Sequence, residues 1–127
     1  MIFDIDHFKR INDKYGHAAG DTVLRELVTV VNANIRSGDH FARWGGEEFI
    51  LLCSSTSLES ACTLAEKIRS AVSGHLFDIK ASPLSVTLSI GVTNCKAHDD
   101  FESTLKRADA ALYGAKNYGR NLVEVGP

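Results

Sequence analysis

The sequence predicts an α+β domain in which helices cover a mixed, mainly antiparallel sheet. Segments with strand and helix character alternate along the 127 residues. Two apolar runs flank Gly45 and Gly46 as the arms of a β-hairpin, which requires at least one antiparallel pair. The length suits a single unit, so we expect residues 1–127 to form one domain of ferredoxin-like type.

The first third of the chain predicts a strand and two helices. Residues 1–6 (MIFDID) alternate apolar and acidic side chains, as a strand does, and a short helix follows over 7–15. Gly16 and Gly20 are expected to break the helical pattern. A long helix is expected from Asp21 to about Arg36, because apolar residues recur every third or fourth position and Asp21 suits an N-cap or the first turn.

The middle of the chain predicts the hairpin and a further helix. The arms are 40–44 and 48–53, and Gly45 and Gly46 suit a two-residue turn between them. Residues 56–74 have the apolar periodicity of an amphipathic helix, which starts with the spacing of a capping box.

The last third predicts two strands, a helix and a closing strand. The strands are 76–80 and 84–93, with Pro83 at the turn between them. A long amphipathic helix is expected over 101–119, and 121–125 suits an edge strand.

Composition excludes several classes of function. The net charge of −2 provides no broad basic field for a nucleic-acid backbone. No apolar run reaches the roughly 18–20 residues of a membrane span. The three cysteines, Cys53, Cys62 and Cys95, form no C-x-x-C pair and suit reduced thiols. We therefore expect a cytoplasmic domain, or the cytoplasmic part of a larger protein.

Two acidic pairs are the strongest candidates for chemistry. Asp4 and Asp6 share one face of the first strand, and Glu47 and Glu48 stand at the tip of the hairpin. A lone D-x-D is more often the polar outer face of an edge strand. Two pairs that meet at the ends of neighbouring strands would instead form a hard-oxygen site for Mg²⁺, which is commonly shared with nucleotide phosphates.

Four stretches, in order and over nearly the whole chain, resemble the GGDEF domain of diguanylate cyclases, here with a GGEEF signature. They are DIDHFKRINDKYGHAAGD, RWGGEEF, SIGVT and ADAALYGAKNYGRN. The resemblance implies the palm-type fold of nucleotidyl cyclases. It also implies condensation of two GTP into cyclic di-GMP and two pyrophosphates by a homodimer, with Mg²⁺ or Mn²⁺ as cofactor. The family usually has a helix and a D-x-L-T-G-L-x-N-R stretch before the first strand, so we expect an N-terminally truncated domain controlled by an upstream sensor.

The resemblance assigns the acidic residues by position. Asp4 and Glu47 match the carboxylates that bind the metal, and Ile5 matches the residue whose carbonyl joins them. Glu47 also matches the proposed base for the 3′-hydroxyl. Glu48 matches the other signature acid, which is assigned to metal binding or to structure, and with Glu47 and Lys9 it is expected among the catalytic residues.

The resemblance also assigns the residues that contact the base of the nucleotide. Asn12 and Asp21 match the pair that reads guanine, since a carboxylate can accept from the guanine N1–H and 2-amino group. His17 matches a position of substrate contact, and Gly45 and Gly46 leave space for the ligand to approach the main chain. Taken alone, these residues would be a helix-ending Asn, an N-capping Asp and a turn histidine.

The resemblance further assigns residues that bind the phosphates and residues of a feedback site. Lys9, Lys116 and Arg120 match the phosphate-binding cations, although basic residues also favour helix C-termini. Arg36 and Asp39 have the spacing of the family's inhibitory R-x-x-D site for cyclic di-GMP. Lys67 aligns with the secondary inhibitory arginine, whose bidentate contacts a lysine cannot make.

Two other functions remain open at this level. A non-catalytic sensor of GTP or cyclic di-GMP would typically have lost signature acids, yet Asp4, Glu47 and Glu48 are all present. A cyclase acting on ATP would require a change in the guanine-reading pair, and Asn12 and Asp21 are both retained.

Overall fold

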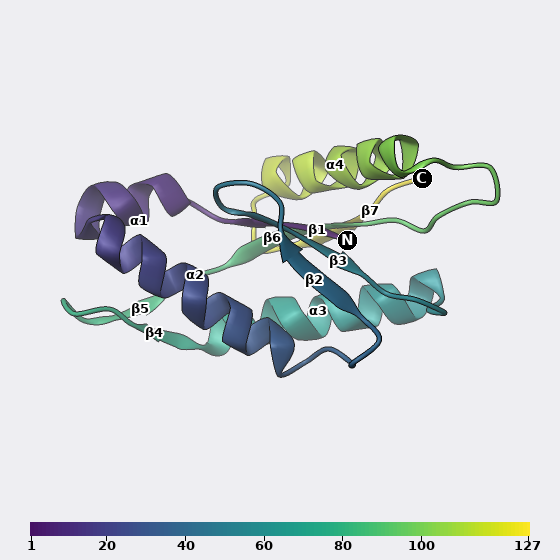
Figure 1. The fold of residues 1–127 in the computed structure, drawn as a ribbon. Coiled ribbons are helices and arrows are strands. Elements are labelled where there is room, and N and C mark those ends of the chain that lie inside the picture. Colours follow the sequence, from purple (N-terminus) through teal and green to yellow (C-terminus); the bar gives the residue numbers. More distant parts are fainter.

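A computed structural model of residues 1–127 shows one five-stranded sheet between helices, and a smaller two-stranded sheet beside it (Figure 1). The predicted α+β class with a mainly antiparallel sheet is confirmed. In chain order the elements are β1 (Ile2–Ile5), α1 (Phe8–Tyr15), α2 (His17–Asn32), β2 (His40–Arg43), β3 (Glu48–Leu52), α3 (Leu58–Gly74), β4 (Leu76–Asp78), β5 (Pro83–Ser85), β6 (Leu88–Val92), α4 (Phe101–Asn117) and β7 (Val123–Val125).

The first strand lies at the centre of the large sheet. The strand order is β2-β3-β1-β6-β7, and of the four pairings only that of β6 with β7 is parallel. Because β1 runs antiparallel to β3 and β6, its end lies beside their first residues, Glu48 and Leu88. All four residues of β1 are buried, so the interpretation of Asp4 as part of an edge strand is wrong.

Helices cover both faces of this sheet. Figure 1 shows α4 on one face and α2 with α3 on the other. The larger core, with Phe3, Phe49 and Ile90 at its centre, belongs to the face under α2 and α3. Ile2 and Ile50 point to the opposite face and pack with α4. The period of two along each strand therefore divides the apolar side chains between two layers.

The second helix starts and ends earlier than the sequence predicted. It begins at His17 and ends at Asn32, so Asp21 lies inside the helix and does not cap it. The break falls at Gly16, whose φ of 90° favours glycine. Gly20 continues the helix, because there the absence of a side chain makes room for Asn12.

Two further boundaries differ from prediction. The expected strand 84–93 divides at Val86 and Thr87. Its first part pairs with β4 as a separate hairpin, and its second part joins the central sheet as β6. The cap of α3 is Ser57, whose side chain accepts from the Ser60 amide at 3.1 Å, so the predicted capping box one residue earlier is not formed.

The tip of the β2–β3 hairpin is also longer than predicted. Four residues, 44–47, separate the strands, and neither Gly45 nor Gly46 has a positive φ. The predicted two-residue turn is therefore wrong. The Trp44 amide donates to the Glu48 carbonyl at 2.8 Å, which closes the ladder before the loop.

The last helix and strand follow the prediction closely. The helix expected over 101–119 is α4, and the expected edge strand is β7 at one border of the sheet. None of the helices has the length and hydropathy that crossing a membrane would require.

Candidate functional site

Asp4 of the first acidic pair meets Glu47 and Glu48 of the second where β1 and β3 lie side by side, whereas Asp6 bonds to other residues. Asp4 stands opposite Glu48 in the antiparallel ladder, and the Ile5 amide donates to the Glu47 carbonyl at 3.2 Å. The Asp4 residue is only 7% exposed, and Glu47 and Glu48 are half-buried. Like charges directly opposed in a sheet are destabilising, so this arrangement favours a cation between them.

Lys116 brings one positive charge to this cluster from the last turn of α4. Its Nζ lies 2.7 Å from Asp4 Oδ2. Burial raises the pKa of Asp4 above its ordinary value, and the hydrogen bond from Lys116 opposes that rise. Burial also raises the pKa of Glu48, and the nearby charge of Asp4 raises it further. A cation that stabilises the ionised forms would therefore bind here favourably.

The donor set suits a divalent cation shared with a ligand. The groups at this point are carboxylate and carbonyl oxygens, which Mg²⁺ and Mn²⁺ prefer. No three histidine, cysteine, aspartate or glutamate side chains converge closely enough to form a complete metal site. Mg²⁺ is commonly held by one or two carboxylates with phosphate oxygens supplying other ligands. Asp4, Glu47 and the Ile5 carbonyl fit that pattern.

The glycine loop is braced by Arg43, which sequence reasoning did not single out. The Arg43 guanidinium donates to the Gly45 carbonyl at 3.1 Å and to the Gly46 carbonyl at 2.7 Å. These bonds occupy both loop carbonyls. The loop is also attached to α4, because the Trp44 ring lies edge-on to that of Phe101 at 5.8 Å between centroids.

The predicted guanine-reading pair lies on two helices in contact. Asn12 is on α1, and a Cβ added to Gly20 of α2 would overlap Asn12 Oδ1. Asp21, the next residue of α2, is exposed. The small residue at position 20 thus lets α1 and α2 approach closely enough to bring the two predicted residues to neighbouring positions. His17 is exposed at the start of α2.

The remaining predicted cations are arranged around the same end of the sheet. Lys9 is exposed on α1, which follows β1 directly. Arg120 is exposed just beyond α4, four positions after Lys116, and has a φ of 63°. Of the three predicted phosphate ligands, only Lys116 makes a hydrogen bond to an acidic side chain of the cluster.

Arg36 and Asp39 form a separate site at the other end of β2. The Asp39 carboxylate accepts from the Arg36 amide at 2.9 Å, and the Arg36 guanidinium donates to Thr56 at 2.8 Å. Both residues line a polar cavity of about 310 Å³ between this turn and the start of α3. Lys67 lies further along α3 and is not among the residues lining this cavity.

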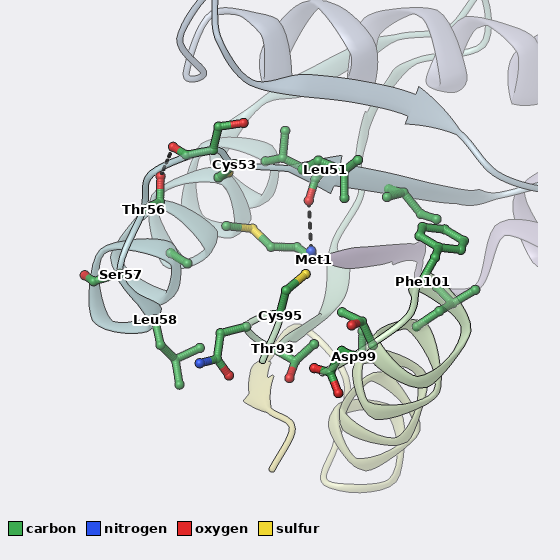
Figure 2. A pocket seen from close by; sticks show the side chains of 18 of the residues that line it. Met1, Leu51, Cys53, Thr56, Ser57, Leu58, Thr93, Cys95, Asp99 and Phe101 are labelled. Atoms are coloured by element: carbon green, nitrogen blue, oxygen red, sulfur yellow. Dashed lines mark hydrogen bonds between the residues drawn. The ribbon is translucent and has the colours of Figure 1, made fainter. Parts of the chain in front are cut away.

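The largest cavity, of about 690 Å³, lies away from the carboxylate cluster, although Thr56 and Phe101 are among the residues that line it. It surrounds Met1 at the start of β1, whereas Asp4 stands near the end of that strand. Figure 2 shows the Met1 amino group on the Leu51 carbonyl, with Cys95 and Phe101 among the side chains around the space. Hydrophobic residues contribute 11 of its 20 lining positions, a composition poorly suited to a triphosphate.

Comparison with known proteins confirms the predicted family. The profile of the family described as "Diguanylate cyclase, GGDEF domain" matches residues 1–122. Diguanylate cyclase DgcP of Pseudomonas aeruginosa is 46% identical over 124 residues, which cover 98% of this chain and 18% of that protein. The chain spans about a fifth to a third of the length of the curated relatives that it matches.

Solved structures agree in fold over almost the entire chain. The GGDEF domain of DgcB from Caulobacter crescentus in complex with c-di-GMP is 35% identical with a TM-score of 0.92, over 98% of this chain and 74% of that one. The active GGEEF domain of a diguanylate cyclase from Vibrio cholerae is 37% identical with a TM-score of 0.91, over 99% and 80%. The chain described here therefore belongs to the GGDEF domain family of diguanylate cyclases.

Proposed function

We propose that this chain is a catalytic domain that condenses two GTP molecules into cyclic di-GMP and releases two pyrophosphates. The observation that carries the proposal is the meeting of Asp4 with Glu47 and Glu48 at the β1–β3 pairing, beside the glycine loop. A degenerate binding domain would have no need to keep three carboxylates in mutual repulsion. The relatives support it, since DgcP is named a diguanylate cyclase and the Vibrio cholerae GGEEF domain is described as active.

The carboxylates have distinct roles in this proposal. Asp4, Glu47 and the Ile5 carbonyl hold Mg²⁺ or Mn²⁺, which when bound supplies charge stabilisation at the phosphates and lowers the pKa of a nearby hydroxyl. Glu47 accepts the proton of the 3′-hydroxyl as that oxygen attacks the α-phosphate of the other GTP. Glu48 lies opposite Asp4 and maintains the negative potential of the site.

The basic residues orient the triphosphate. Lys116 donates a hydrogen bond to Asp4 at 2.7 Å, which places its charge beside the metal carboxylates. Lys9 and Arg120 flank the same end of the sheet and bind the β- and γ-phosphates together with Lys116. The glycine loop, whose carbonyls Arg43 occupies, allows the phosphates to approach the main chain.

The nucleoside is selected by Asn12 and Asp21, with His17 beside it. The Asp21 carboxylate accepts from the guanine N1–H and 2-amino group, and an adenine would leave that acceptor unpaired. Two chains face each other as a symmetric dimer, because each contributes one GTP and the two attacks are equivalent. We place this dimer in the cytoplasm, under the control of an upstream regulatory domain.

The direct test is product formation. The purified chain is incubated with Mg²⁺ and either GTP or ATP, and nucleotides are separated by chromatography. We expect cyclic di-GMP and pyrophosphate in a ratio of one to two from GTP, and no cyclic dinucleotide from ATP. Sedimentation in the same buffer relates activity to dimer formation.

The outcomes separate the proposal from its alternatives. GTP binding without product, in a sample that sedimentation shows to be dimeric, would contradict the cyclase and support a GTP sensor. Binding of cyclic di-GMP alone would support a sensor of that nucleotide. A cyclic product from ATP would contradict the role of Asp21.

We further propose that Arg36 and Asp39 form a product-binding site that inhibits the enzyme. The polar cavity around them is separate from the carboxylate cluster, and the DgcB domain is described in complex with c-di-GMP. Replacing Arg36 with alanine removes a guanidinium that can bind phosphate. We expect the concentration of cyclic di-GMP that halves the initial rate to rise about tenfold or more. The measurement is initial rate against added product.

Lys80→Ala is the matched control for this prediction. It also removes one positive charge, but from the exposed turn between β4 and β5. Its inhibition curve should coincide with that of the parent. Equal inhibition of the parent and the Arg36→Ala variant would place the feedback site elsewhere.

A further inference from the structure

Asp6 is a buried carboxylate for which the proposed chemistry has no use. It follows β1, and its residue is only 5% exposed. Its side chain accepts three hydrogen bonds, from Thr87 Oγ1 at 2.7 Å, Ser89 Oγ at 2.7 Å and the Asn121 amide at 2.9 Å. No lysine or arginine pairs with it. A buried carboxylate is costly unless it is satisfied, and here neutral donors alone satisfy it.

The third donor belongs to an unusual turn after α4. Gly119, Arg120 and Asn121 all have positive φ, at 124°, 63° and 49°. Two consecutive non-glycine residues in this region are uncommon and persist only where their surroundings hold them. The turn carries Arg120, and it ends the helix that brings Lys116 to Asp4.

The surroundings hold Asn121 from two sides. Asp6 accepts from its backbone amide, and Arg69 of α3 donates to its side-chain oxygen at 2.8 Å. The Arg120 amide donates back to the Ala115 carbonyl at 3.0 Å, in the pattern of a Schellman helix end. The backbone on each side of Arg120 is therefore fixed, and Asp6 makes the one bond that connects this turn to the strand of Asp4.

We propose that Asp6 is a positioning residue, which holds the turn after α4 so that Arg120 is directed at the phosphates. The proposal rests on the proposed function, because that function assigns Arg120 to the triphosphate. Asp6 acts through Arg120 and has no contact with the ligand. This role explains why Asp6, the second acid of the D-x-D pair, is buried among neutral donors while Asp4, the first, faces Lys116.

Asp6→Asn tests this with almost no change in size. Asparagine has one acceptor oxygen where aspartate has two, and its amide group cannot accept from the donors that face it. The probe is a GTP analogue with a methylene group between the α- and β-phosphates, which binds but cannot release pyrophosphate. We expect its dissociation constant, measured by calorimetry with Mg²⁺, to rise about tenfold.

A double-mutant cycle with Arg120→Ala tests whether Asp6 positions Arg120 or only stabilises the fold around the site. If Asp6 acts through Arg120, then Asp6→Asn weakens analogue binding in the parent but not in the Arg120→Ala background. Independent, additive losses in the two variants would overturn the proposal. Because the cycle measures binding, it gives an answer even if the product assay shows no cyclase activity.

Two other variants remove the remaining ambiguities. Ser89→Ala deletes a different donor to Asp6 and leaves the Asn121 bond intact, so it should change analogue binding by less than about twofold. Asn121→Gly removes the side-chain oxygen that Arg69 holds and makes the turn backbone more mobile, while the amide that donates to Asp6 is kept. It remains informative if Asp6→Asn does not fold. We expect it to weaken binding in the parent and not in the Arg120→Ala background. Unchanged binding in Asn121→Gly would contradict the role of the turn.

Discussion

Replacing Glu47 with glutamine is expected to lower the rate of cyclic di-GMP formation by about 10²–10⁴-fold. Glutamine has nearly the same shape, but it cannot accept the proton of the 3′-hydroxyl and it contributes no negative charge toward a divalent cation. The Glu47 carbonyl would still accept from the Ile5 amide, so the β1–β3 ladder should persist. The measurement is the initial rate of product formation at saturating GTP and Mg²⁺.

Glu102→Gln provides the matched control. It removes one negative charge from an exposed position on α4, where Glu102 pairs only with Lys106. Exposed pairs of this kind contribute little, so its rate and thermal midpoint should equal those of the parent. A rate for Glu47→Gln within about threefold of the parent would show that Glu47 acts neither as base nor as metal ligand.

Replacing Gly91 with alanine is expected to destabilise the fold by about 3 kcal/mol. Gly91 is buried in β6 beneath α4, where an added Cβ would overlap the Ala108 carbonyl oxygen and crowd the Leu112 amide. Both obstacles are helix backbone, so no side chain can rotate away. The helix must instead move off the sheet, and the contacts of Ala108 and Leu112 with Ile2 and Ile50 weaken.

Thermal and urea unfolding would measure this loss, and the midpoint should fall by about 10 °C. Gly74→Ala is the control, because a Cβ there meets nothing within 4 Å and α3 gains a better helix former. It should be as stable as the parent or more so. Equal midpoints for Gly91→Ala and the parent would mean that α4 does not pack as closely on β6 as described.

Local patterns predicted the elements but not all of their boundaries. The periodicity over 101–119 identified α4 almost completely, since its apolar face is buried from Ala108 to Ala115. The start of α2 was misplaced because Gly20 was predicted to interrupt the helix. Glycine is instead required at position 20 because Asn12 approaches there from another helix, and no local sequence pattern contains that contact.

The β2–β3 hairpin also combines features that local patterns predicted with features that tertiary contacts decided. Its two arms and the acids at its tip were predicted from RWGGEEF, but a two-residue turn was expected at Gly45 and Gly46. The loop is longer because the Trp44 amide closes the ladder on Glu48, and Arg43 then binds the carbonyls of the two glycines. A side chain outside the turn thus determines its shape.

The sequence by itself determined the fold class, through the periodicity of its segments, and the family, through the resemblance of four motifs. That resemblance also named the residues proposed for the site. Only the tertiary structure decided which of them meet. Asp4 contacts Lys116 across 112 positions, and Asp6 contacts Asn121 across 115. Such contacts depend on strand order and on how α4 lies over the sheet, which follow from the packing of the whole chain and not from any one segment.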